Sequence, residues 1–137
     1  MSKAVQLFVV AFVSSTMSAT WAASSCENDP TLSTLQINEC LSAKYKTTDR
    51  KLNQVYKQIL NEFGKRSKDG EVSSNAARQE LIATQKAWLQ FRDGECGARY
   101  AYFLGGTIRN STALECKIDL TNARIATLQW WLDVLAQ

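Results

Sequence analysis

The 137-residue sequence predicts an all-α fold: an antiparallel bundle of three long helices linked by two disulfide bonds. Apolar residues repeat at spacings of three and four along three long stretches, which is helical rather than strand periodicity. The chain contains one proline, Pro30, and scarcity of proline favours long helices. It also contains four cysteines and no histidine, behind an N-terminus with the pattern of a secretory signal.

The N-terminal segment predicts a cleavable signal peptide over residues 1–22. Lys3 precedes an apolar run at 4–13, which is too short to span a bilayer, and a small, polar stretch ends at Ala22. A lipoprotein signal would require a branched apolar residue three positions before Cys26, where Ala23 stands, and lipidation would leave an odd number of thiols. We therefore expect a periplasmic or secreted protein, with no transmembrane segment after cleavage and one helical domain at 23–137.

The first helix is expected from about Ser33 to Phe63. Ser33 and Gln36 have the spacing of a capping box. Gly64 and the polar run 65–74 predict a turn. One face carries the apolar stripe, formed by Ile37, Leu41, Tyr45, Thr48, Leu52, Val55, Ile59 and Phe63.

The second helix is expected from about Asn75 to Leu104, ending at Gly105 as a left-handed cap. Gly94 and Gly97 weaken it, so the bundle can have a broken helix, the first or this one. Its inward residues are predicted to be Leu81, Thr84, Trp88, Phe91, Ala98 and Tyr102.

The third helix has the clearest periodicity. Thr112 and Glu115 match a second capping box. The stripe that follows comprises Leu114, Ile118, Thr121, Ile125, Leu128, Leu132 and Leu135. The residues predicted to be buried across the bundle are Ile37, Leu52, Val55, Leu81, Trp88, Phe91, Ile125, Leu128 and Leu132.

The four cysteines allow three disulfide connectivities, and an exported chain is expected to form disulfides. Pro30 lets the preceding arm fold back along the first helix, which favours Cys26–Cys40. Cys96 and Cys116 flank the turn between two antiparallel helices, which favours Cys96–Cys116. A zinc site is disfavoured because the chain has no Cys-x-x-Cys pair and no histidine.

Several polar residues flank the apolar stripes at helical spacing: Asp49, Asn53 and Tyr56 on the first helix, Gln85, Trp88 and Arg92 on the second, and Arg124 on the third. Large polar groups beside a core need partners. We expect a network of Asp49, Asn53, Gln85, Arg92 and Arg124 to bridge the helices. Arg92 and Arg124 are expected to be substantially buried, with at least one of them bonded to Asp49 or another carboxylate. In this network Arg92 stacks on Trp88, and Arg124 is an ion-pair partner.

These residues form a longer pattern: Cys40, Asp49-x-x-Leu52-Asn53-x-x-Tyr56, Gln85-x-x-Trp88-x-x-Phe91-Arg92-Asp93-x-x-Cys96, Gly105-Gly106-Thr107, Cys116, Leu120-Thr121, Arg124 and Leu128. The pattern covers essentially the whole chain after the signal. It resembles the LprI-like family of small exported bacterial proteins, named after a lysozyme inhibitor. The resemblance implies a helical, disulfide-bonded periplasmic domain and, more loosely, inhibition of lysozyme. The shared polar residues are interpreted as maintaining the fold.

Enzymatic and nucleic-acid-binding functions are disfavoured. No nucleophile stands beside a base, and acidic residues such as Asp93 and Glu95 are more simply charges on a helix face. We therefore predict no catalytic residues and no cofactor. The formal net charge is +3, one unit of which is Lys3 in the expected signal, so the mature surface lacks the strong positive charge of nucleic-acid-binding domains.

Two features are candidates for binding a protein partner. The first is the basic loop 64–70, with Lys65, Arg66 and Lys68, which could enter a lysozyme cleft; its simpler interpretation is a solvated turn. The second is Trp130, predicted to point away from the core. The favoured function is inhibition of lysozyme, or of a related peptidoglycan-cleaving enzyme, by cleft occlusion. The alternative is a structural or assembly module that binds another envelope protein, and a glycan hydrolase is least favoured.

Overall fold

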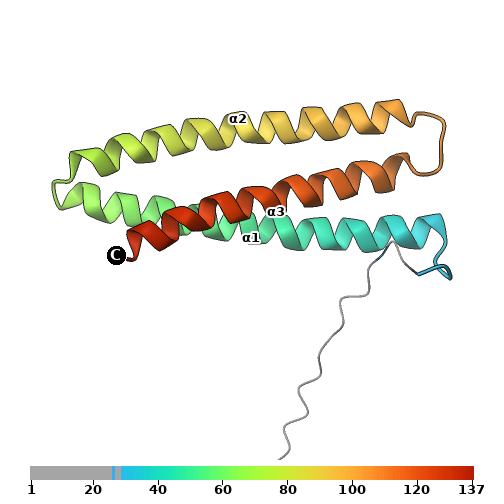
Figure 1. Ribbon diagram of the computed structural model, residues 1–137, viewed down its shortest axis with the longest axis horizontal. Helices are drawn as coiled ribbons and strands as arrows, with labels where there is room; N and C mark the ends of the chain where they lie inside the picture. The colour runs from blue at the N-terminus through green and yellow to red at the C-terminus, as the bar shows by residue number, and fades with distance from the viewer. Residues whose placement is uncertain (1–25, 27–28) are drawn as a thin grey trace, which may run out of the picture.

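The computed structural model describes residues 26 and 29–137, and three helices account for most of them (Figure 1). They are α1 (Thr34–Lys68), α2 (Val72–Tyr102) and α3 (Arg109–Leu135). Consecutive helices run antiparallel, and the described residues contain no strand, so the predicted all-α bundle is confirmed. The expected signal peptide at 1–22 lies outside the described residues.

The start of α1 agrees with the prediction, whereas its end differs from it. At the start, the capping box is present: the Gln36 amide donates to Ser33 Oγ, and the Ser33 amide donates to Gln36 Oε1 at 2.9 Å. At the other end, the turn lies within the expected range 64–74 but is shorter, because α1 continues through Gly64 to Lys68 and α2 begins at Val72. Asp69 is the C-cap, and the chain reverses at Gly70, whose φ of +93° is readily adopted by glycine.

The backbone hydrogen bonds around Gly70 explain this later end. The Gly70 amide donates to the Ser67 carbonyl and the Glu71 amide to the Arg66 carbonyl, the two bonds of a Schellman motif. Lys65, Arg66 and Lys68 occupy the last turn, where positive charge interacts favourably with the helix dipole.

The second helix is continuous through Gly94 and Gly97, so neither α1 nor α2 is broken. The chain then reverses at Gly105, whose φ is +96°. α3 begins at Arg109, three residues before the expected cap, with Ile108 as its N-cap. The Thr112 amide already donates to the Ile108 carbonyl at 3.0 Å, so Thr112 lies inside the helix and the predicted second capping box is wrong.

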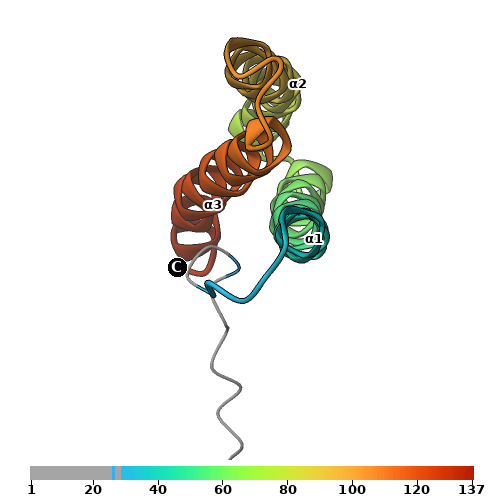
Figure 2. The ribbon, with the colours of Figure 1, turned by 90° about the vertical axis from the view of Figure 1, so that its right-hand side faces the viewer.

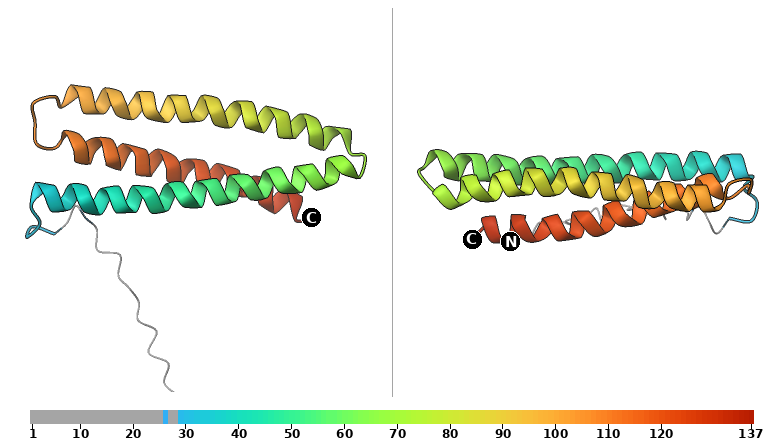
Figure 3. Two further views of the ribbon diagram at one scale, coloured as in Figure 1. Left: turned by 180° about the vertical axis from the view of Figure 1, so that it is seen from behind. Right: turned by 90° about the horizontal axis from the view of Figure 1, so that it is seen from above.

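The third helix packs against both α1 and α2, as the end-on view shows (Figure 2). The turn between α1 and α2 extends beyond the C-terminal end of α3 in every side view (Figures 1 and 3). The bundle therefore has a protruding end at this turn. Within the described part of the chain, none of the three helices combines the length and apolarity needed to cross a bilayer.

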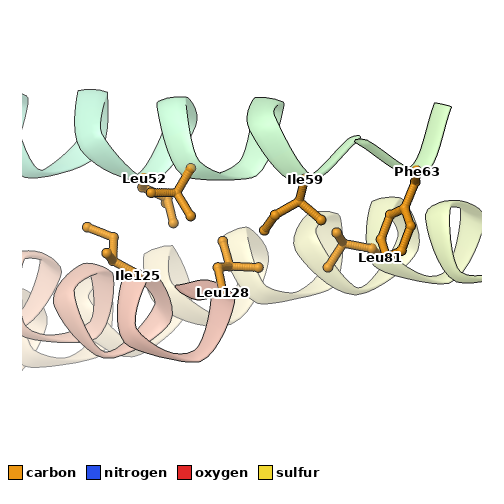
Figure 4. Packing of buried hydrophobic residues seen from close by; sticks show 7 residues of the cluster. Leu52, Ile59, Phe63, Leu81, Ile125 and Leu128 are labelled. Carbon is orange, nitrogen blue, oxygen red and sulfur yellow. The ribbon is translucent and has the colours of Figure 1, made fainter. Parts of the chain in front are cut away.

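The main core lies where the three helices meet (Figure 4). It consists of Leu52, Val55, Ile59, Phe63, Leu81, Ile125 and Leu128. A smaller cluster of Cys26, Leu41 and Ile118 lies toward the opposite end from the α1–α2 turn. The predicted stripes of α1 and α3 are thus the observed inward faces. Six of their residues are only half-buried: Ile37, Tyr45, Thr48, Leu114, Leu132 and Leu135.

The predicted inward face of α2 is partly wrong. Phe91 is 55% exposed and Tyr102 84% exposed, whereas the buried residues are Ser74, Leu81, Gln85, Arg92 and Cys96. Trp88 is half-buried. The middle of α2 buries polar side chains that bond to α1 and α3, and this turns Phe91, one residue before Arg92, outward.

Both predicted disulfides form, Cys26–Cys40 with a Cα–Cα distance of 5.8 Å and Cys96–Cys116 with 5.6 Å. Both are in the half of the bundle that contains the start of α1 and the α2–α3 turn. Cys96 and Cys116 are completely buried, so their bridge joins α2 to α3 from within.

Candidate functional site

Arg92 is the centre of a polar cluster that joins the three helices. It is 5% exposed, and its Nη1 donates to Asp49 Oδ1 on α1 at 2.9 Å and to Thr121 Oγ1 on α3 at 3.4 Å. Its Nε donates to Asp93 Oδ1 at 3.2 Å, and Asp93 lies 3.7 Å from the Lys117 ammonium. The charge on Arg92 therefore has a carboxylate partner on its own helix and another on α1.

Aromatic rings complete the surroundings of Arg92. Its guanidinium carbon is 5.2 Å from the Trp88 ring centroid and 5.5 Å from that of Tyr45, so the expected contact with Trp88 is present. Burial acts to lower the pKa of Arg92, but the hydrogen bond that Arg92 donates to Asp49 and the nearby charges outweigh it, and the pKa is raised. Arg92 thus remains a cation although it is buried.

Arg124 has a different environment. Its Nε donates to the neutral Gln85 Oε1 at 2.9 Å, and its guanidinium carbon lies 6.0 Å from the Trp88 ring centroid. The expected ion pair is wrong, because no carboxylate among the described residues pairs with Arg124. Its Nη2 is buried without a hydrogen-bond partner in this part of the chain. Burial lowers the pKa of Arg124, with a smaller opposing effect from Tyr56.

The structure divides the predicted network into two parts. Asn53 Nδ2 donates to Asp49 Oδ2 at 3.1 Å, which attaches Asn53 to the Arg92 cluster, whereas Gln85 and Arg124 form a separate pair. The Trp88 ring is within reach of both guanidinium groups. Tyr56 packs at the edge of the main core, and burial raises the pKa of its hydroxyl.

Sequence reasoning missed Thr121, Tyr45 and Lys117 as members of the Arg92 cluster. Thr121 and Tyr45 had been assigned to apolar stripes, and only the packing of three helices brings them to Arg92. The cluster contains no nucleophile beside a base. Within the described residues, no three His, Cys, Asp or Glu side chains are grouped so as to hold a metal ion. The geometry is that of a structural link between helices.

A second candidate site is the protruding end of the bundle, residues 64–75, which we call the hairpin tip. Of its three basic residues, Lys65 pairs with Glu62 at 2.7 Å, and Arg66 Nη2 donates to the Leu135 carbonyl of α3 at 2.8 Å. Lys68 is exposed and has no ion pair among the described residues. Arg66 therefore anchors the tip to α3, while Lys68 is available to a partner.

A groove of about 640 Å³ lies between α1 and α2 beside the hairpin tip. We call it the α1–α2 groove. Its lining includes the amide side chains of Gln58, Asn61 and Asn75 and the cations Lys65, Lys68 and Arg78, with Gly64 among them. Arg78 is half-buried here, and no sequence pattern had indicated it.

Trp130 is 57% exposed on α3 and, as predicted, points away from the core. It packs edge-on against Trp131, with ring centroids 4.9 Å apart, and Trp131 in turn contacts Phe63 of the core at 5.3 Å. Trp130 is not part of the α1–α2 groove.

The opposite end of the bundle also exposes apolar side chains that the sequence did not indicate: Leu35, Tyr102, Leu104 and Ile108.

Comparisons with known proteins identify the family of this chain. A family model described as "Lysozyme inhibitor LprI" matches residues 26–128. An uncharacterized protein of Rhizobium meliloti (strain 1021) is 27% identical over 101 residues, covering 72% of this chain and 73% of that protein. The uncharacterized protein YecT of Escherichia coli (strain K12) is 30% identical over 98 residues, covering 68% of this chain and 60% of YecT. No solved structure matches.

Proposed function

Because this chain belongs to the lysozyme inhibitor LprI family, we propose that it is an exported, non-catalytic protein that inhibits a lysozyme or a related peptidoglycan-cleaving enzyme. In this proposal the hairpin tip occludes the active-site cleft of the enzyme. The kind of partner is inferred from the family, and the mode of binding is inferred from the shape and charge of the bundle.

Export is supported by the cysteines. All four form disulfides, both bridges are internal to the domain, and such bonds persist in oxidising compartments such as the periplasm. This agrees with the signal peptide expected at 1–22. A periplasmic or secreted location would place the protein where it can meet a lysozyme.

The observation that carries the inhibitory mode is the protrusion of the hairpin tip beyond the end of α3 (Figure 3). A narrow tip can enter a cleft that the full width of a three-helix bundle cannot. Glycosidase clefts hold a pair of carboxylates, and the unpaired cation Lys68 is suited to face them. The Arg66–Leu135 bond and the Schellman motif hold the tip in one conformation, so little entropy is lost on binding.

Two acidic residues at the centre of the bundle support a non-catalytic function. Asp49 and Asp93 both accept hydrogen bonds from Arg92, at the junction of the three helices. Their carboxylates are thereby occupied in structure, whereas a glycosidase needs two carboxyl groups that face a substrate.

One observation favours a second function, that of an assembly module for another envelope protein. Trp130 and Val134, four residues apart on α3, are both exposed, and exposed tryptophan is a frequent anchor in protein interfaces. In this case binding would depend on the α3 face and not on the hairpin tip.

The decisive experiment uses the oxidised protein from residue 23 onward. We would measure its binding to lysozymes of several types by calorimetry, and the rate at which each lysozyme degrades peptidoglycan in its presence. We expect at least one type to be bound and inhibited, and Lys68→Glu to weaken inhibition about tenfold relative to the control Lys86→Glu on α2. Absence of inhibition for every type, or loss of binding on Trp130→Ala but not on Lys68→Glu, would favour the assembly module.

A further inference from the structure

The α1–α2 groove has an excess of positive charge. It is lined by Lys65, Lys68 and Arg78, and by one acidic residue, Glu62. Glu62 pairs with Lys65 at 2.7 Å, which leaves Lys68 and Arg78 without an ion pair among the described residues. These two cations come from opposite walls of the groove, Lys68 from α1 and Arg78 from α2. A ligand between them would be attracted if it carried negative charge.

The uncharged lining is suited to a polypeptide. Gln58, Asn61 and Asn75 each present an amide, which both donates and accepts hydrogen bonds, as the peptide groups of an extended chain do. None of the lining residues is aromatic. The groove therefore lacks the flat apolar surface on which a sugar ring stacks, and this argues against a glycan as its ligand.

Gly64 opens the floor of the groove. No heavy atom lies within 4 Å of the position that a Cβ would occupy there, so a partner backbone can approach α1 directly. Gly94 and Gly97 on α2 are equally open, and a glycine alone therefore means little. Gly64 differs from them because it lies in a groove between two unpaired cations.

From the two cations, the amides and the open glycine, we infer that the α1–α2 groove binds an acidic, extended segment of the partner protein. Carboxylates of that segment pair with Lys68 and Arg78, and its backbone runs past Gly64. The identity of the partner rests on the proposed function, whereas its chemistry follows from the groove. The inference thus assigns to the inhibited enzyme a stretch rich in Asp and Glu at or beside its cleft.

The test uses two fluorescent peptides, an octaglutamate and an octaglutamine, and the oxidised mature protein at low salt. By fluorescence anisotropy we expect octaglutamate to bind, with an affinity that falls as salt is added, and octaglutamine not to bind. Gly64→Leu fills the groove, and Arg78→Gln removes a cation. Each should lower the affinity for octaglutamate at least about fivefold.

Two matched controls separate the groove from the rest of the surface. Gly94→Leu makes the same change at an exposed helical glycine on α2, and Lys86→Gln removes an exposed cation elsewhere on α2. Both should bind octaglutamate as the wild type does. Leucine is favoured over glycine in a helix, so neither leucine variant should melt below the wild type.

A parallel lysozyme assay distinguishes failure of this inference from failure of the proposed function. If octaglutamate binding depends on Gly64 and Arg78 but no lysozyme is inhibited, the groove is upheld and the proposed function fails. If the wild type inhibits a lysozyme and Gly64→Leu inhibits equally well, the inference is overturned and the function stands. Equal binding of both peptides, binding of neither, or binding of a muramyl disaccharide-peptide in place of octaglutamate would also overturn it.

Discussion

The Arg92 guanidinium on α2 donates to the Asp49 carboxylate on α1 across 2.9 Å. The Arg92 side chain is 6% exposed and that of Asp49 33%, so the pair is at the boundary between the interior and the solvent. This bond connects α1 to α2. Its geometry indicates that Arg92 and Asp49 hold the bundle together.

We expect Arg92→Ala to destabilise the protein by about 2–3 kcal/mol, measured by chemical denaturation. The substitution removes the partner of a partly buried carboxylate and leaves Thr121 and the Trp88 ring without the guanidinium. The exposure of Asp49 keeps the effect below that of a fully buried pair. Lys86→Ala, at an exposed position of the same helix, is the control and should change the stability little.

A contrary result would show that the polar cluster around Arg92 has a role in recognition and not in stability. If Arg92→Ala unfolds at the same denaturant concentration as the wild type but no longer binds its partner, the shared polar residues form a recognition site. Asp49→Asn provides an independent check, because it keeps the shape of the side chain and removes its charge. A structural pair predicts that it is less stable than the wild type.

Replacing Cys96 and Cys116 together by serine should cost about 3 kcal/mol, because the bridge restricts a 20-residue segment of the unfolded chain. Cys26 and Cys40, 14 residues apart, should have a smaller effect when replaced, because they attach an arm to α1 and do not join two helices. Thermal unfolding of the two double variants tests this order. Neither should impair a hairpin tip at the other end of the bundle, so selective loss of inhibition would count against the tip as the inhibitory element.

Two basic residues of the hairpin tip, Arg66 and Lys65, should differ in how much they contribute to the free energy of unfolding. Arg66→Ala removes a hydrogen bond to the Leu135 carbonyl at the end of α3, and we expect it to cost about 0.5–1.5 kcal/mol. Lys65→Ala removes only an exposed pair with Glu62 and should cost less than about 0.5 kcal/mol. Melting curves of the two variants test whether Arg66→Ala is the less stable one. Equal melting temperatures would mean that Arg66 does not anchor the tip.

Local sequence signals determined much of this fold. Ser33 and Gln36 predicted the start of α1 because a capping box involves only neighbouring residues. The apolar spacing of α3 predicted its buried face, since few polar residues interrupt it. The Cys96–Cys116 pair followed from two antiparallel helices that flank one turn, and the Cys26–Cys40 pair from an arm that Pro30 lets fold back along α1.

Tertiary structure decided the inward face of α2 and the way the expected polar network divides into an Arg92 cluster and a separate Gln85–Arg124 pair. Phe91 is more apolar than Arg92, so periodicity alone selects the wrong side of the helix; Arg92 is buried because Asp49 and Thr121, both far away in sequence, meet it there. The same holds for the α1–α2 groove, since Lys68 and Arg78 become neighbours only when the chain reverses at Gly70. Sequence periodicity records which side chains avoid water, whereas the pairing of polar groups depends on distances that exist only after the helices have packed.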